Sequence, residues 1–124
     1  PRLPLGTSRA RLEAYAVEVA AMLKADRTAA LRRGAPVSTA VDAPGRMLRS
    51  GAGRRTLRLP ADVTVRASLP RFCNDRPAGS TIAFFPDGLS CGGVIALSRN
   101  GTAYEVKVNW LTGGVEIVPR RAAS

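Results

Sequence analysis

The side chains that usually carry out catalysis are scarce in this chain. It contains no histidine and only two cysteines, Cys73 and Cys91, and its lysines are Lys24 and Lys107. A nucleophile needs a neighbouring general base, and neither these residues nor the carboxylates have a spacing typical of such a pair. Two distant cysteines without histidine do not form a zinc site, and no acidic loop has calcium spacing. The sequence therefore predicts no catalytic residue, no metal site and no cofactor, and it favours a protein that is not an enzyme.

Asp87 is the carboxylate whose neighbours most resemble a ligand set, because Gly88 and Ser90 follow it closely. It also lies within Pro86-Asp87-Gly88. Proline presets φ, aspartate bonds the local backbone and glycine accepts a positive φ, so this tripeptide is typical of a turn. We interpret Asp87 as a turn residue.

The charge balance raises the question of nucleic acid binding. The chain has nineteen basic and nine acidic residues, a net charge of +10. A basic stripe can bind nucleic acid by releasing counterions from phosphate. The arginines available for one are Arg46, Arg49, Arg54, Arg55, Arg58, Arg120 and Arg121. Basic residues are dispersed along the whole sequence, however, and no aromatic residue interleaves this set to stack on bases. A solvated basic surface is the favoured interpretation, and DNA binding is the alternative.

The first third of the chain predicts one long helix. Residues 8–33 contain no proline or glycine, and apolar residues recur at steps of three and four. Thr7 or Ser8 can cap its start, and Gly34 can leave the helix in a left-handed conformation. The predicted apolar stripe comprises Leu12, Tyr15, Ala16, Val19, Met22, Leu23, Ala30 and Leu31. With 124 residues, the chain fits one domain.

The remainder of the chain predicts short antiparallel strands. Asn100-Gly101 is the strongest hairpin signal, and Thr112-Gly113-Gly114 predicts a second turn. Residues 104–110 alternate apolar and polar side chains, so we expect Tyr104, Val106, Val108 and Trp110 to pack under the helix. The other expected strands are residues 36–42, 56–59, 63–65, 81–85, 94–97 and 115–118, and the expected loops are residues 47–55 and 69–80.

The order of residues in the last third resembles the carboxyl-terminal domain of H-type minor pseudopilins of type II secretion systems. This family is related to the minor pilins of type IV pili. The matching residues are Phe85, Asp87, Gly88, Ser90 and Gly93, then Tyr104, Val106 and Val108, then Leu111, Thr112 and Gly113. Arg27, Ala30 and Gly34 resemble the end of the pseudopilin helix, and residues 1–4 resemble the segment that follows its membrane anchor.

The resemblance implies an α+β, pilin-like fold. A long N-terminal helix, residues 1–34, is expected to pack on two small antiparallel sheets formed by residues 35–124, the two parts making one pseudopilin domain. The implied function is that of a structural subunit near the tip of the periplasmic pseudopilus, supporting export of folded proteins across the outer membrane. Its partners would be major and minor pseudopilins, contacted through helix packing. The alternatives are a type IV minor pilin that binds DNA through the arginines named above and an unrelated exported enzyme.

The resemblance also implies a periplasmic domain of a single-pass inner-membrane protein. The chain has no run of about 18 apolar residues that could span a bilayer. We therefore expect a leader and about 20 apolar residues upstream of Pro1, and we expect the chain without that anchor to be monomeric. A mature protein with an ordinary surface helix is the alternative.

The oxidation state expected for Cys73 and Cys91 depends on the cellular compartment of the domain. In a periplasmic domain they are expected to form a disulfide, whereas in the cytosol they stay as thiols. The chain can fold back to bring them together. Loop geometry cannot be read from sequence, so two unpaired thiols are the alternative.

Overall fold

The computed structural model describes residues 6–121, which begin with helix α1 (Arg9–Arg33). The Ser8 hydroxyl accepts a hydrogen bond from the Arg11 N–H at 3.1 Å and caps the first turn. Gly34 follows the last turn with a φ of 65°, and its N–H donates to the Ala30 carbonyl at 3.0 Å. Glycine adopts this conformation without a steric penalty from Cβ, so the helix ends where its sequence predicts.

One face of α1 is buried along most of its length. The buried residues are Leu12, Ala16, Val19, Ala20, Met22, Leu23, Asp26 and Ala30. Tyr15 is half-buried, and the assignment of Leu31 to the buried stripe is wrong, because its side chain is 43% exposed. Successive helical residues are separated by about 100° around the axis, which turns Leu31 away from the side on which Ala30 is buried.

Two four-stranded antiparallel sheets and a small hairpin form the rest of the domain. The first sheet has the order β3-β2-β1-β7, with β1 (Val37–Asp42), β2 (Met47–Arg49), β3 (Thr56–Arg58) and β7 (Thr81–Phe84). The second has the order β10-β9-β8-β4, with β4 (Thr64–Ser68), β8 (Gly93–Arg99), β9 (Thr102–Val108) and β10 (Val115–Arg121). The hairpin pairs β5 (Phe72–Cys73) with β6 (Arg76–Pro77). The predicted α+β class with two small sheets is confirmed.

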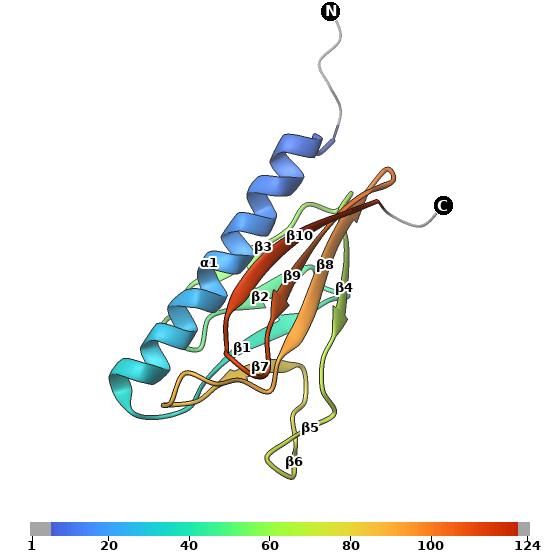
Figure 1. Ribbon diagram of the computed structural model, residues 1–124. Coiled ribbons are helices and arrows are strands. Elements are labelled where there is room, and N and C mark those ends of the chain that lie inside the picture. Colours follow the sequence, from blue (N-terminus) through green and yellow to red (C-terminus); the bar gives the residue numbers. More distant parts are fainter. Residues whose placement is uncertain (1–5, 122–124) are drawn as a thin grey trace, which may run out of the picture.

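Helix α1 runs along one side of both sheets (Figure 1). The hairpin β5–β6 projects from the end of the molecule opposite to the start of the helix, whereas the turn between β8 and β9 and the end of β10 lie near that start. Asn100-Gly101 forms the turn between β8 and β9 with φ values of 51° and 78°. Positive φ at both positions is what a two-residue hairpin requires, so this predicted turn is confirmed.

Two expectations for the middle of the chain need correction. Residues 47–55 were expected to be a solvated hairpin tip or loop, but they begin with strand β2, in which Leu48 is fully buried and pairs with Val41 and Leu57. The strand is too short to show a period of two. Residues 69–80, expected to be a loop, contain the hairpin β5–β6.

The core lies between α1 and the inner faces of both sheets. Tyr104, Val106 and Val108 of β9 are buried, as their alternation predicts. The expected packing of Trp110 under the helix is wrong, because β9 ends at Val108 and Trp110 is 66% exposed. The period of two holds only while the strand continues.

Candidate interaction surface

Arg27 fastens the helix to two turns that lie far from it in the sequence. Its Nε donates to the Gly88 carbonyl at 2.8 Å, and its Nη2 donates to the Thr112 carbonyl at 3.4 Å. Arginine suits this role because its planar guanidinium carries several donors in fixed directions. One side chain therefore holds the turn after β7 and the turn between β9 and β10 against the helix.

The two turns also pack directly against each other. Gly113 and Gly88 have φ values of 72° and 86°, a region in which glycine is favoured. A Cβ atom at Gly113 would collide with the carbonyl oxygen of Gly88 and approach Nε of Arg27. Of the motif residues expected from sequence, Arg27, Gly88, Thr112 and Gly113 therefore lie together.

The other motif residues have different positions. Phe85 closes the turn by donating its N–H to the Leu89 carbonyl at 2.9 Å, and Asp87 accepts the Leu89 N–H at 2.9 Å, as its interpretation as a turn residue predicts. Gly93 begins β8, where a Cβ would lie 3.1 Å from Cγ1 of Ile82. Leu111 follows Trp110 on the exposed turn, and Gly34 ends the helix outside this cluster.

Cys73 and Cys91 form a disulfide, with their Cα atoms 5.8 Å apart. The bond ties the β5–β6 hairpin to the segment that precedes β8. Next to it, the Ser90 hydroxyl donates to the Ala83 carbonyl at 2.6 Å and accepts the Gly92 N–H at 2.9 Å. The predicted pairing of the cysteines is thus present.

A groove with a volume of about 660 Å³ opens beside the disulfide. Its walls carry large apolar side chains that are widely exposed: Phe72 (65%), Trp110 (66%), Leu111 (62%) and Leu89 (41%). Asp87 is the carboxylate on its wall. The sequence pattern does not predict this surface, because the alternation in residues 104–110 places Trp110 on the buried face of a strand.

Comparison with known proteins defines the family. No profile of a described protein family matches the chain. The chain is 34% identical over 116 residues to the type II secretion system protein H of Xanthomonas campestris pv. campestris, across 94% of this chain and 68% of that protein. The chain belongs to the type II secretion protein H family. It is a minor pseudopilin of type II secretion.

Solved structures share the fold of this pseudopilin. The minor pseudopilin EpsH from the type 2 secretion system of Vibrio cholerae matches with a TM-score of 0.68 at 11% identity, over 86% of this chain and 95% of that one. The type IV minor pilin FimU of Pseudomonas aeruginosa matches with a TM-score of 0.66 at 20% identity, over 90% of each chain. The long helix on antiparallel sheets is therefore the pseudopilin and minor pilin architecture.

The arginines considered for DNA binding are spread over the pseudopilin. Arg49 and Arg58 belong to the first sheet, and Arg54 and Arg55 belong to the loop between β2 and β3. Arg46 uses its Nε to bind the Val63 carbonyl at 2.8 Å. At the end of β10, Arg120 pairs with Glu105 at 3.1 Å and is followed by Arg121. The comparisons give DNA binding no support.

Within residues 6–121 of the pseudopilin, no three or more Cys, Asp or Glu side chains gather so as to hold a metal ion. No helix in the same range is long and apolar enough to cross a bilayer.

Asp26 is a fully buried carboxylate that sequence reasoning missed. It accepts hydrogen bonds from the Thr39 hydroxyl at 2.6 Å, the Ser50 hydroxyl at 2.6 Å, and the N–H groups of Gly51 and Ala52 at 3.0 and 3.1 Å. A buried carboxylate is costly unless its oxygens are bonded in this way. The available signal was an acidic residue three positions after the buried Leu23 and four before the buried Ala30.

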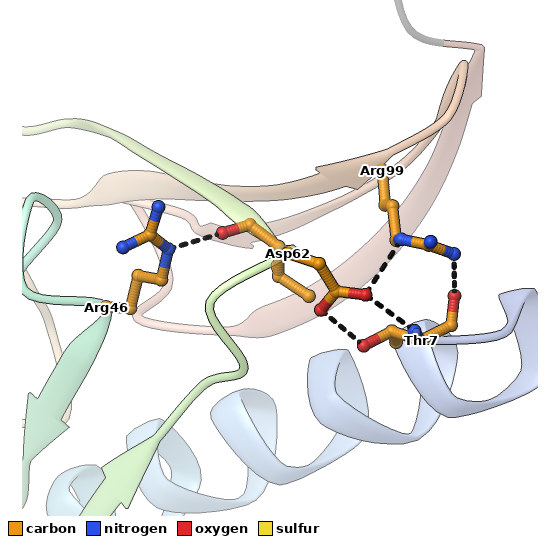
Figure 2. Close-up of polar contacts among 5 residues, drawn as sticks. Thr7, Arg46, Asp62 and Arg99 are labelled. Carbon is orange, nitrogen blue, oxygen red and sulfur yellow. Dashed lines mark hydrogen bonds and ion pairs between the residues drawn. The ribbon is translucent and has the colours of Figure 1, made fainter. Parts of the chain in front are cut away.

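A second polar cluster fixes the start of the helix, as Figure 2 shows. Asp62 accepts the Thr7 N–H at 2.6 Å and the Thr7 hydroxyl at 2.8 Å, and it pairs with Arg99 at 2.9 Å. These contacts hold the pKa of the Asp62 carboxyl below its usual value, the backbone and side-chain hydrogen bonds from Thr7 contributing most and the charge of Arg99 adding to them. Arg99 also donates to the Thr7 carbonyl.

Proposed function

We propose that this pseudopilin is a periplasmic subunit near the tip of the pseudopilus, where it joins the shaft of major pseudopilins to the other minor subunits. There it supports the export of folded proteins across the outer membrane. The observation that carries the proposal is the match to protein H over nearly the whole chain. The Cys73–Cys91 disulfide supports the periplasmic location, because disulfides persist in oxidising compartments.

The proposed partners are other pseudopilins, contacted through the outer face of α1. This face carries small exposed side chains, among them Ala10, Ala14 and Ala21, together with Val17, which is 52% exposed. The distance between two packed helices depends on the side chains at their contact, so small residues permit a close approach. The role is structural, and nucleic acid is not among the proposed partners.

We also propose that an apolar segment upstream of Pro1 anchors the protein in the inner membrane, and that residues 1–124 alone are monomeric. The opposite, apolar face of α1 already packs on both sheets. It is therefore not exposed to form a tight homodimer. Analytical ultracentrifugation tests the oligomeric state. A stable dimer that dissociates on substitution of Val17 would contradict this part of the proposal.

Deletion of the gene, followed by complementation with the full-length protein, tests the function. The deletion strain is expected to retain exported proteins in the periplasm, and complementation is expected to restore their release. A deletion strain that secretes normally would overturn the proposal.

A matched pair of glycine variants adds a structural control to the complementation. Gly113→Ala places a Cβ against the Gly88 carbonyl, whereas Gly53→Ala meets nothing within 4 Å. We expect Gly53→Ala to restore secretion and Gly113→Ala to restore it less well. Equal complementation by the two variants would show that the paired turns do not matter for the function.

A further inference from the structure

The apolar groove beside the disulfide is held open by fixed parts of the fold. The Cys73–Cys91 bond lies in its wall and secures the hairpin that carries Phe72. Arg27 binds the carbonyls of Gly88 and Thr112, which are the chain neighbours of Leu89 and Leu111. The exposure of these apolar side chains is therefore built into the fold. Contiguous exposed apolar surface on a protein is typical of an interaction site.

The charge of the groove is opposite to that of the chain as a whole. Asp87 lies in its wall, and no lysine or arginine among residues 6–121 lines it, although the chain has a net charge of +10. Two other surface hollows are basic. One is lined by Lys24, Arg32 and Arg33, and the other by Arg9, Arg120 and Arg121. Opposite charges on two surfaces steer their association and fix its register, so the groove suits a cationic partner.

The groove and one of the basic hollows lie at opposite ends of the molecule. The hollow lined by Arg9 and Arg121 is at the start of α1, and the β5–β6 hairpin beside the groove is at the other end (Figure 1). A filament is built from heterologous contacts, in which one end of a subunit meets the opposite end of another. A head-to-tail contact between two subunits of this fold would therefore bring the groove of one to the helix-start end of the other.

We propose that the groove receives an arginine from the helix-start end of another pseudopilin. The guanidinium pairs with Asp87, and its aliphatic stem lies on Trp110 and Leu111. Arginine combines a charge that pairs with carboxylate and a flat apolar surface that stacks on aromatic rings. This inference rests on the proposed function and extends it, because it names the surface and the chemistry of one contact between subunits.

Site-specific photo-crosslinking in secreting cells tests the proposal. A photoreactive phenylalanine analogue replaces Trp110 in the full-length protein, and the same analogue at Thr64, an exposed residue of β4, is the matched control. We expect Trp110 to give an adduct with an arginine-containing peptide near the helix start of another pseudopilin, and Thr64 to give none with that peptide. An adduct with an exported protein, the secretin or lipid, or no adduct, would overturn the proposal.

Charge variants test the pairing with Asp87. Asp87→Asn keeps an oxygen that can accept the Leu89 N–H, so the turn is preserved while the charge is removed. We expect about a fivefold lower yield of the adduct for Asp87→Asn, as loss of a charge-assisted contact predicts. Asp87→Lys should abolish it, and an arginine-to-glutamate change in the crosslinked partner should restore it.

The secretion assay distinguishes failure of the groove proposal from failure of the proposed function. If Asp87→Asn and Asp87→Lys leave the adduct yield unchanged while the deletion strain is defective in secretion, the groove proposal is wrong and the proposed function stands. If the deletion strain secretes normally, the proposed function itself is wrong.

Discussion

Arginine side chains in this pseudopilin act as tethers to backbone carbonyls. Arg27 binds Gly88 and Thr112, Arg46 binds Val63, and Arg33 binds Ala52. Each bond joins α1 or the turn before β2 to a backbone carbonyl in a turn or loop elsewhere in the chain. Part of the large positive charge thus has a structural use, since a guanidinium carries several N–H donors in a rigid, planar arrangement.

Arg27→Ala is expected to lower the free energy of unfolding by about 1 to 2 kcal/mol, because two carbonyls lose a charged donor. Arg32→Ala, an exposed change on the same helix, should change it by less than about 0.5 kcal/mol. Urea unfolding of both variants provides the measurement. Similar values for the two variants would show that the tether contributes nothing to stability.

Asp62→Asn is expected to destabilise the protein at neutral pH and to have little effect in acid. The folded-state pKa of Asp62 lies below the ordinary value of 3.8. Its stabilising contribution is therefore fully present above that ordinary value and is lost as the pH falls through the lowered pKa. Urea unfolding at neutral pH and at about pH 2.5 tests this linkage. Glu116→Gln, a charge removal at an exposed position of β10, is the control, and a pH-independent effect of Asp62→Asn would contradict the assignment.

At the scale of elements, the helix organises a loop that has little structure of its own. Asp26 gathers the hydroxyl of Ser50 and the N–H groups of Gly51 and Ala52. Gly51 lies so close to Ser38 that a Cβ would collide with the Ser38 carbonyl. The segment between β2 and β3 is therefore packed between the helix and β1.

Asp26→Ala is expected to lower the free energy of unfolding by about 3 kcal/mol or more, because it leaves buried hydrogen-bond donors without partners. The effect should be concentrated in the loop, with faster hydrogen exchange at the Ala52 amide than at amides in β9. Glu18→Ala, an exposed change on the same helix, should leave exchange unaltered. If the Ala52 amide keeps its protection in Asp26→Ala, the loop is held by other contacts.

Local sequence signals predicted the helix and the turns, whereas the candidate interaction surface depends on contacts between residues far apart in the sequence. Ser8, Gly34 and Asn100-Gly101 are read correctly because caps and tight turns depend on neighbouring residues. The contact between Arg27 and Thr112 spans 85 residues, so the pattern placed both in a family motif without showing that they meet. Trp110 was assigned to the core because the alternation of Tyr104, Val106 and Val108 continues to it, but Asn109 already begins the turn by accepting the N–H groups of Leu111 and Thr112.

At the scale of the whole molecule, the disulfide joins two parts of the chain separated by 18 residues. Closing a loop of this size stabilises a domain by about 3 kcal/mol in the chain-entropy model. A variant with Cys73→Ser and Cys91→Ser should lose about that amount in urea unfolding, and reduction of the unmodified protein should have the same effect. Non-reducing mass spectrometry with alkylation is the check, and two alkylatable thiols in periplasmic protein would refute the bond.

The polar contacts of Thr7 and of Arg27 also determine how the molecule carries mechanical load along α1. Thr7, bound to Asp62 and Arg99, fixes the start of the helix, and Arg27 fixes its last third to the turns. A pull along the helix axis is therefore shared between both attachments and the packed side chains between them, which must shear together. Forced unfolding depends on the barrier to that concerted slip, so we expect the helix to pass tension to the sheets and not to peel away from either end.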